Sequence, residues 1–218
     1  RAKYSGIEIT AVDTFLVEGN CCFVKISTNA GISGLGEGSI SENKVGTIAQ
    51  CIKDMEGHLI GKDPTNIEYL WQGLYRWNRW HVGVLFSTAL SAIDIALWDI
   101  VGQATGAPVH QVLGGRVLDS IPIYNTCADW RYAVLSGSTA FGLSSPTDHE
   151  TLPGKYDDLQ GFLNDAGSVA ESLLDEGITA MKIWPFDQFV RKTNGQHTSA
   201  ADVNKGMEPV LKIPEPAI

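Results

Sequence analysis

Few residues of this chain have a type and spacing that could do chemistry, and Lys182 is the first candidate. It lies in the apolar segment Thr179–Trp184, which is typical of a buried strand. A lysine at such a position can bind an anion or transfer a proton. A lone lysine on a strand is more often structural or solvated, so Lys182 needs a context before it identifies a site.

Histidine and cysteine supply no metal motif. Four histidines show no ligand spacing, namely His58, His110, His149 and His197. The cysteines, Cys21, Cys22, Cys51 and Cys127, form no C-x-x-C pair. We therefore expect no zinc site, and the thiols fit a free, reduced state in the cytosol.

The segment 77–84 is a second candidate region, because it is a loop dense in aromatic residues. Arg79 in this loop could pair with a carboxylate, with Trp80 and His81 beside it. The alternative is that Trp77 and Trp80 are packing anchors and that His81 is an ordinary polar loop residue.

The N-terminal half supplies the elements of an α+β domain of about 115 residues. Alternation and turn residues predict three antiparallel strands, at 7–17, 22–28 and 32–38. Apolar spacing of three and four predicts helices over 45–59, over 67–74 and from Ser87 onward. Three strands followed by three helices form one layered domain.

The C-terminal half predicts a βαβ unit, whose strands are parallel. The order is a strand at 121–127, a long loop over 128–155, a helix at 159–174 and a strand at 179–184. A further helix is expected around 200–211. Loops as long as 128–155 are usually functional or disordered.

Composition excludes several classes of protein. The net charge of −9 makes nucleic acid and anionic membranes unlikely partners. No uninterrupted apolar run reaches about 18 residues, so we expect no membrane span. An anionic small molecule stays possible, because a bound cation can reverse the local field.

The segment Ser91–Gly115, SAIDIALWDIVGQATGAPVHQVLGG, is the most specific motif. It predicts a buried helix that ends near Gly106, a turn at Pro108 and a glycine exit at Gly114. It resembles the mandelate racemase and muconate-lactonizing branch of the enolase superfamily. The turn GLGEG at 34–38 resembles the same family. The resemblance covers roughly residues 5–190 and is weak on substrate.

The resemblance implies a fold class and two domains. Residues 1–118 would form the α+β capping domain, a three-stranded antiparallel meander with helices. Residues 119–218 would begin a (β/α) TIM-type barrel. Only about 100 residues follow Ser120, whereas a complete barrel takes about 250. We therefore expect an incomplete barrel and a chain that represents the N-terminal part of the family.

The resemblance also implies an activity. The superfamily uses Mg²⁺ to stabilise the enediolate formed when a proton next to a carboxylate is removed. Lys182 matches the first lysine of the branch's Lys-x-Lys pair, whereas Trp184 stands at the base position. This departure favours acid-sugar dehydration over two-base racemisation or epimerisation. The partner would be a small carboxylate or sugar acid, and the protein a cytoplasmic homo-oligomer.

In this family the capping domain closes over the substrate. The implied substrate-binding residues are Glu18, Asn20, Arg79, Trp80, His81 and Trp184, beside Lys182 as the catalytic candidate. The acidic metal ligands come from later barrel strands, so we expect no metal ligand within this chain. The alternative is a truncated, non-catalytic homologue that acts as an interaction module or an inert fragment.

Overall fold

The computed structural model describes residues 6–17, 21–40, 44–77, 79–80, 83–128, 158–186, 189, 193 and 196–213. The chain divides into two compact units, Arg1–Asp119 and Ser120–Ile218, which are described separately.

A three-stranded antiparallel sheet forms one layer of the first unit. Its strands are β1 (Ile9–Val17), β2 (Cys21–Thr28) and β3 (Ser33–Glu37), in the order β1-β2-β3. Alternation along β2 turns Cys22, Val24 and Ile26 into the core, where all three are fully buried. The predicted meander is therefore confirmed, with its first strand starting at Ile9 rather than Ile7.

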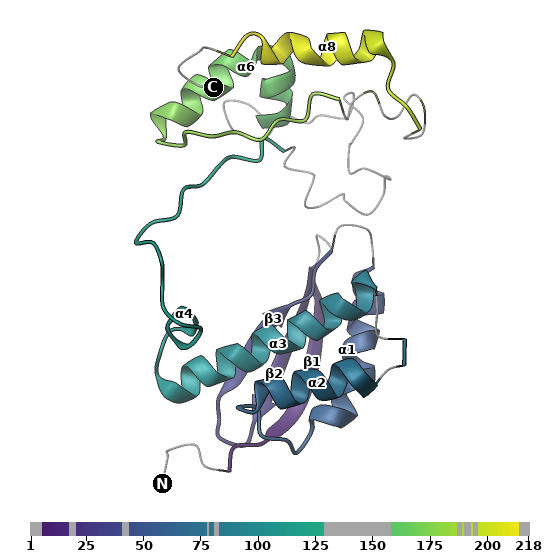
Figure 1. The fold of residues 1–218 in the computed structure, drawn as a ribbon, viewed down its shortest axis with the longest axis vertical. Helices are drawn as coiled ribbons and strands as arrows, with labels where there is room; N and C mark the ends of the chain where they lie inside the picture. Colours follow the sequence, from purple (N-terminus) through teal and green to yellow (C-terminus); the bar gives the residue numbers. More distant parts are fainter. Residues whose placement is uncertain are drawn as a thin grey trace. The chain divides into compact units, whose positions relative to one another are not determined.

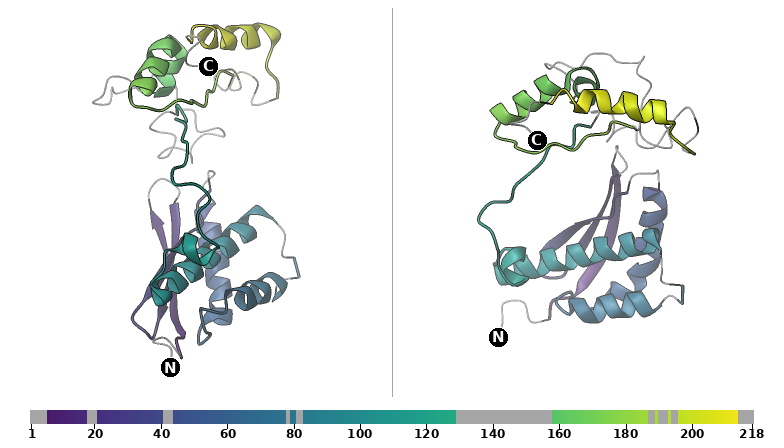
Figure 2. Two further views of the ribbon diagram at one scale, coloured as in Figure 1. Left: turned by 60° about the vertical axis from the view of Figure 1, so that its left-hand side comes forward. Right: turned by 45° about the horizontal axis from the view of Figure 1, so that its top comes forward.

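Helices α1 (Val45–Leu59) and α3 (Val84–Thr105) form the second layer, on one face of the sheet (Figures 1 and 2). Helix α2 (Ile67–Trp77) packs against α1 and α3, and the short α4 (Val109–Val112) packs against α3. The predicted stripe on α1 is buried, from Ile48 to Leu59. The sequence placed the start of α3 at Ser87, but the Ser87 N–H donates to the Gly83 carbonyl, 3.0 Å away, so the first turn begins earlier. Residues after Pro108, expected to be a turn, form α4.

The contact between α3 and β3 explains why glycine occupies positions 34 and 36 and why α3 carries Asp99. A side chain at Gly34 would overlap the Ala96 carbonyl, and one at Gly36 would overlap the Ala92 carbonyl. The helix backbone therefore packs directly on the strand. The Asp99 carboxylate accepts a hydrogen bond from the Leu35 N–H at 2.9 Å, which fixes the helix against β3.

Helix α3 is also the one segment among the described residues whose length and composition would suit a membrane span. This differs from the expectation based on uninterrupted apolar runs, because α3 is apolar on average while carrying Asp94 and Asp99. In the fold, Ile93, Ala96 and Ile100 are fully buried in the core with the sheet. Packing inside the unit accounts for the hydrophobicity of α3.

The second unit contains α6 (Asp158–Asp175) and α8 (Ala200–Val210). Asp165 interrupts α6 with a non-helical backbone, and its carboxylate accepts hydrogen bonds from the Ser168 N–H and hydroxyl. These bonds lower the pKa of Asp165. Helix α6 therefore restarts after Asp165 as if from an N-cap.

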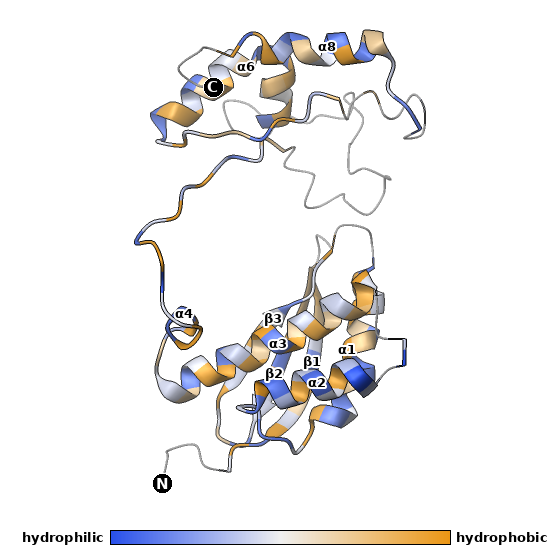
Figure 3. Cartoon of the chain, in the orientation of Figure 1, coloured by the Kyte–Doolittle hydropathy of each residue, from blue (hydrophilic) through white to orange (hydrophobic). Residues whose placement is uncertain are grey.

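The two expected barrel strands meet at a single parallel bridge, Asn125 with Met181. The predicted strands at 121–127 and 179–184 are thus wrong in length, although their parallel pairing is confirmed. Parallel strands are stable when neighbours and helices cover them. Ile121 and Ile123 are instead 79% and 65% exposed, and apolar and polar residues alternate along the connector that leads to them (Figure 3).

Candidate functional site

The parallel bridge positions the candidate site, because it joins the ends of the two strand segments. The Asn125 N–H donates to the Ala180 carbonyl at 3.0 Å, and the Lys182 N–H donates to the Asn125 carbonyl at 2.7 Å. Lys182 and Trp184 follow this bridge along the chain, two positions apart and outside any assigned strand.

Lys182 and Trp184 are brought together. The Lys182 ammonium nitrogen lies 4.2 Å from the centre of the Trp184 ring, which is a cation–π contact. The Trp184 indole N–H donates to the Thr126 carbonyl at 2.6 Å. The lysine side chain is exposed and the tryptophan half-buried. The site thus presents a positive charge that rests on an anchored aromatic ring.

Asn125 fixes the end of the first strand segment. Its side-chain oxygen accepts from the Cys127 N–H at 2.6 Å, and its amide donates to the Asp158 carboxylate at 3.0 Å, at the start of α6. Cys127 takes the left-handed conformation, with φ +48°, which is uncommon outside glycine. This turn holds the Thr126 carbonyl where Trp184 reaches it.

The thiol of Cys127 is not a nucleophile in this arrangement. Burial, with a smaller contribution from the Asp158 carboxylate, raises the pKa of Cys127 to about 11. A thiol with this pKa is protonated at neutral pH, and only the thiolate is reactive. Cys127 is therefore a buried structural residue beside the site.

The predicted residues of the capping unit are placed only in part. Arg79 and Trp80 lie in a turn after α2, and Trp80 is 78% exposed. They belong to the first unit, whereas Lys182 and Trp184 belong to the second. Glu18, Asn20 and His81, with most of the expected loop at 128–155, lie outside the described residues.

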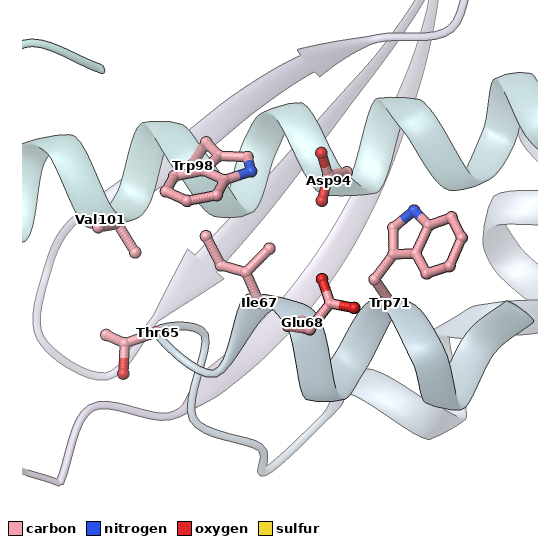
Figure 4. Close-up of a pocket in the computed structure, with 7 residues that line it drawn as sticks. All are labelled: Thr65, Ile67, Glu68, Trp71, Asp94, Trp98 and Val101. Carbon is pink, nitrogen blue, oxygen red and sulfur yellow. The ribbon is translucent and has the colours of Figure 1, made fainter. Parts of the chain in front are cut away.

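A groove between α2 and α3 was missed by sequence reasoning (Figure 4). It measures about 560 Å³ and is lined by Thr65, Ile67, Glu68, Trp71, Asp94, Trp98 and Val101. Burial and the nearby Glu68 raise the pKa of Asp94, while a hydrogen bond from the Trp98 indole opposes that shift. The sequence signal was the i, i+4 spacing of Asp94 and Trp98, which puts them on one face of the helix.

Among the residues that the structure describes, no group of three histidine, cysteine or acidic side chains is placed to hold a metal ion. The described part of the chain therefore does not fit a magnesium centre by itself.

Comparisons with known proteins place this geometry in a family. The model of the mandelate racemase / muconate lactonizing enzyme N-terminal domain matches residues 8–114. D-galactonate dehydratase of Variovorax paradoxus is 43% identical over 119 residues, which make up 55% of this chain and 31% of that protein. The corresponding enzyme of Pectobacterium atrosepticum is 40% identical over 119 residues, again 55% of this chain and 31% of that protein. The matched region of this chain thus covers less than a third of the length of each of these curated relatives.

Solved structures extend the likeness beyond the first unit. An enolase from Pantoea ananatis with bound D-gluconate and magnesium is 38% identical, with a TM-score of 0.52 over 55% of this chain and 30% of that one. An enolase protein from Sargasso Sea environmental sequencing is 32% identical, with a TM-score of 0.68 over 95% of this chain and 47% of that one.

The second comparison includes the segment from Ser120 onward, so that segment corresponds to the start of the enolase-type barrel. The fold is a capping domain followed by the first barrel elements. With residues 8–114 matched to the capping-domain family, the chain belongs to the mandelate racemase / muconate lactonizing branch of the enolase superfamily, as its N-terminal part.

Proposed function

We propose that the full-length protein is a Mg²⁺-dependent dehydratase of sugar acids. The observation that carries the proposal is the Lys182–Trp184 pair, in which a fixed cation is present and the second lysine of the racemase branch is replaced by an indole. The likeness to D-galactonate dehydratases and to a gluconate-bound enolase supports the same substrate class.

In the proposed reaction the proton at C2 of a 2,3-dihydroxy acid leaves, followed by the hydroxyl at C3. The proton and the hydroxyl together form water, and the resulting enol becomes a 2-keto-3-deoxy acid. When bound, Mg²⁺ would stabilise the negative charge that develops on the carboxylate. The metal ligands and the base would come from outside the described residues.

Lys182 has the role of a binding and orienting group in this proposal. Its ammonium attracts the substrate carboxylate or a hydroxyl, and the indole of Trp184 cannot accept the C2 proton. Arg79 and Trp80 are proposed to contact the substrate from the capping domain, together with Glu18, Asn20 and His81. We propose residues 1–118 and 119–218 as the domains of a cytoplasmic homo-oligomer.

The experiment is a turnover screen of the full-length protein on a panel of sugar acids that includes D-galactonate and D-gluconate. The expected result is formation of a 2-keto-3-deoxy acid that stops with a chelator and returns with Mg²⁺. Absence of Mg²⁺-dependent turnover on the entire panel would contradict the proposal.

The second candidate is a non-catalytic homologue that acts as an interaction module. The comparisons do not favour it, because the relatives and neighbours that they name are enzymes. Intact mass separates the two: a mass near 23.6 kDa with no metal binding supports the module, whereas a mass of roughly 40 kDa, that of a cap with a full barrel, supports the enzyme.

A further inference from the structure

The three residues Lys182, Trp184 and Thr126 form a closed arrangement across the two strand segments. The Lys182 ammonium rests on the Trp184 ring at 4.2 Å, and the ring is held by its N–H to the Thr126 carbonyl at 2.6 Å. The main chain of Lys182 is bonded at 2.7 Å to Asn125, the residue before Thr126. The main chain of Lys182 is therefore held by Asn125, and its ammonium contacts a ring that is held by the next residue, Thr126.

That piece of backbone is itself held in place. The Asn125 side chain bonds the Cys127 N–H and the Asp158 carboxylate, so the carbonyl of Thr126 lies between two constrained residues. The left-handed φ of Cys127 turns the chain at this point. A strained conformation of this kind persists where the surroundings impose it.

A free lysine on a strand end samples many rotamers, and ordering it costs conformational entropy. The face of an indole ring attracts an ammonium group through a cation–π interaction. The indole has no basic group that could accept a proton. Trp184, two positions after Lys182, contacts the ammonium, and its ring is anchored by the hydrogen bond to the Thr126 carbonyl.

We propose that Trp184 is a positioning residue, which holds the Lys182 ammonium in one place as a fixed cation for an anionic substrate. This inference rests on the proposed function, because it assigns the residue that orients the proposed binding group. Trp184 then affects substrate binding through Lys182 and does not contact the substrate itself.

The first test needs no activity. In NMR spectra of the full-length protein without substrate, the ring current of Trp184 should shift the Lys182 Cε protons upfield. Trp184→Leu should abolish the shift, and Trp184→Phe should keep part of it. The matched control Ile183→Val, at the position between the two residues, keeps the Trp184 ring and should leave the shift unchanged. An unshifted Lys182 signal in the unmodified protein would overturn the proposal, whether or not the enzyme turns over a sugar acid.

The second test is a double-mutant cycle on the sugar acid found in the screen. Trp184→Leu should raise KM about 5- to 20-fold with kcat changed less than about threefold. In the Lys182→Gln background the same change should have less than about a twofold effect. Trp184→Phe should restore part of the loss, which also shows that the site still folds. Additive effects of the two substitutions would overturn the proposal, because Trp184 would then act independently of Lys182.

Discussion

Cys127 shows how a residue beside the site can be tested without knowledge of the substrate. Its thiol is buried and its pKa is raised to about 11, first by burial and then by the Asp158 carboxylate. A raised pKa of an acid means that folding disfavours the charged form. Stability from this group is therefore present below pH 9 and is lost as the pH rises towards 11.

We expect Cys127 to resist alkylation in the native protein. At pH 7.5 iodoacetamide should modify it roughly 100-fold more slowly than in the urea-unfolded protein, because the native thiolate is that much rarer. Mass spectrometry of the Cys127 peptide measures the rate, which should climb as the pH approaches 11. Asp158→Asn should accelerate it only slightly, and equal rates in both states would show that the thiol is not buried as described.

At the scale of the elements, the packing of α3 on β3 decides the stability of the first unit. The strand presents Gly34 and Gly36 to the helix, and any side chain there would overlap backbone carbonyls of α3. Backbone overlap cannot be relieved by a change of rotamer. The glycines of this motif are therefore structural rather than part of a binding loop.

Gly36→Ala should destabilise the protein by at least about 3 kcal/mol, since the helix must move away from the sheet. Gly73→Ala on the exposed face of α2 is the matched control, because nothing lies within 4 Å of its added methyl group. It should stabilise by about 0.5–1 kcal/mol through helix propensity. Urea unfolding followed by circular dichroism measures both changes, and a similar midpoint for the two variants would refute the close packing.

The groove between α2 and α3 gives a pH-dependent prediction. Because burial and Glu68 raise the pKa of Asp94, its contribution to stability is greatest at low pH and is lost as the pH rises through the folded-state pKa. Asp94→Asn should therefore raise the unfolding midpoint at pH 7 and have little effect near pH 4. The gain should stay below about 1 kcal/mol, because both carboxylates are partly solvated.

Glu8→Gln serves as the control for the Asp94 variant, since it removes one negative charge on an exposed residue outside the groove. It should not reproduce the pH dependence. A stabilisation by Asp94→Asn that is the same at pH 4 and pH 7 would show that the Asp94 charge is not the cause.

Sequence periodicity predicted the elements whose partners are close along the chain. The alternation in 22–28 gave β2, and the apolar stripe at Ile48, Ile52 and Leu59 gave α1. The barrel strands were predicted too long, because a strand is defined by its neighbours as well as by its own residues. Of the predicted parallel pairing, the described residues form one bridge, between Asn125 and Met181.

The candidate site was predictable only in outline. The sequence identified Lys182 and Trp184 as candidates by their places in the Lys-x-Lys motif, two positions apart. Sequence alone could not predict that the Thr126 carbonyl accepts from Trp184, 58 positions away, or that the Leu35 N–H donates to the Asp99 carboxylate, 64 positions away. Such contacts depend on how distant segments meet, and no local pattern contains them.

At the scale of the whole molecule, the matched capping domain precedes barrel elements in which the Lys182 ammonium contacts the Trp184 ring. The described residues contain no group of three side chains placed to hold a metal ion. The chain spans 31% of the first dehydratase relative in the matched region, so catalysis is a property to be tested on the full-length protein. Under the proposed function, the tryptophan at the position of the second lysine leaves the full-length protein with a base on one face of the substrate only, so that it dehydrates a sugar acid and does not racemise it.

The most direct test is proton NMR of the full-length enzyme acting on its sugar acid in D₂O with Mg²⁺. We expect a 2-keto-3-deoxy product that carries deuterium at C3, while the unreacted acid keeps its C2 proton and its configuration. Deuterium at C2 of recovered acid with inverted configuration would mean proton exchange on both faces, and it would contradict the assignment of Trp184 as a residue that replaces the second base.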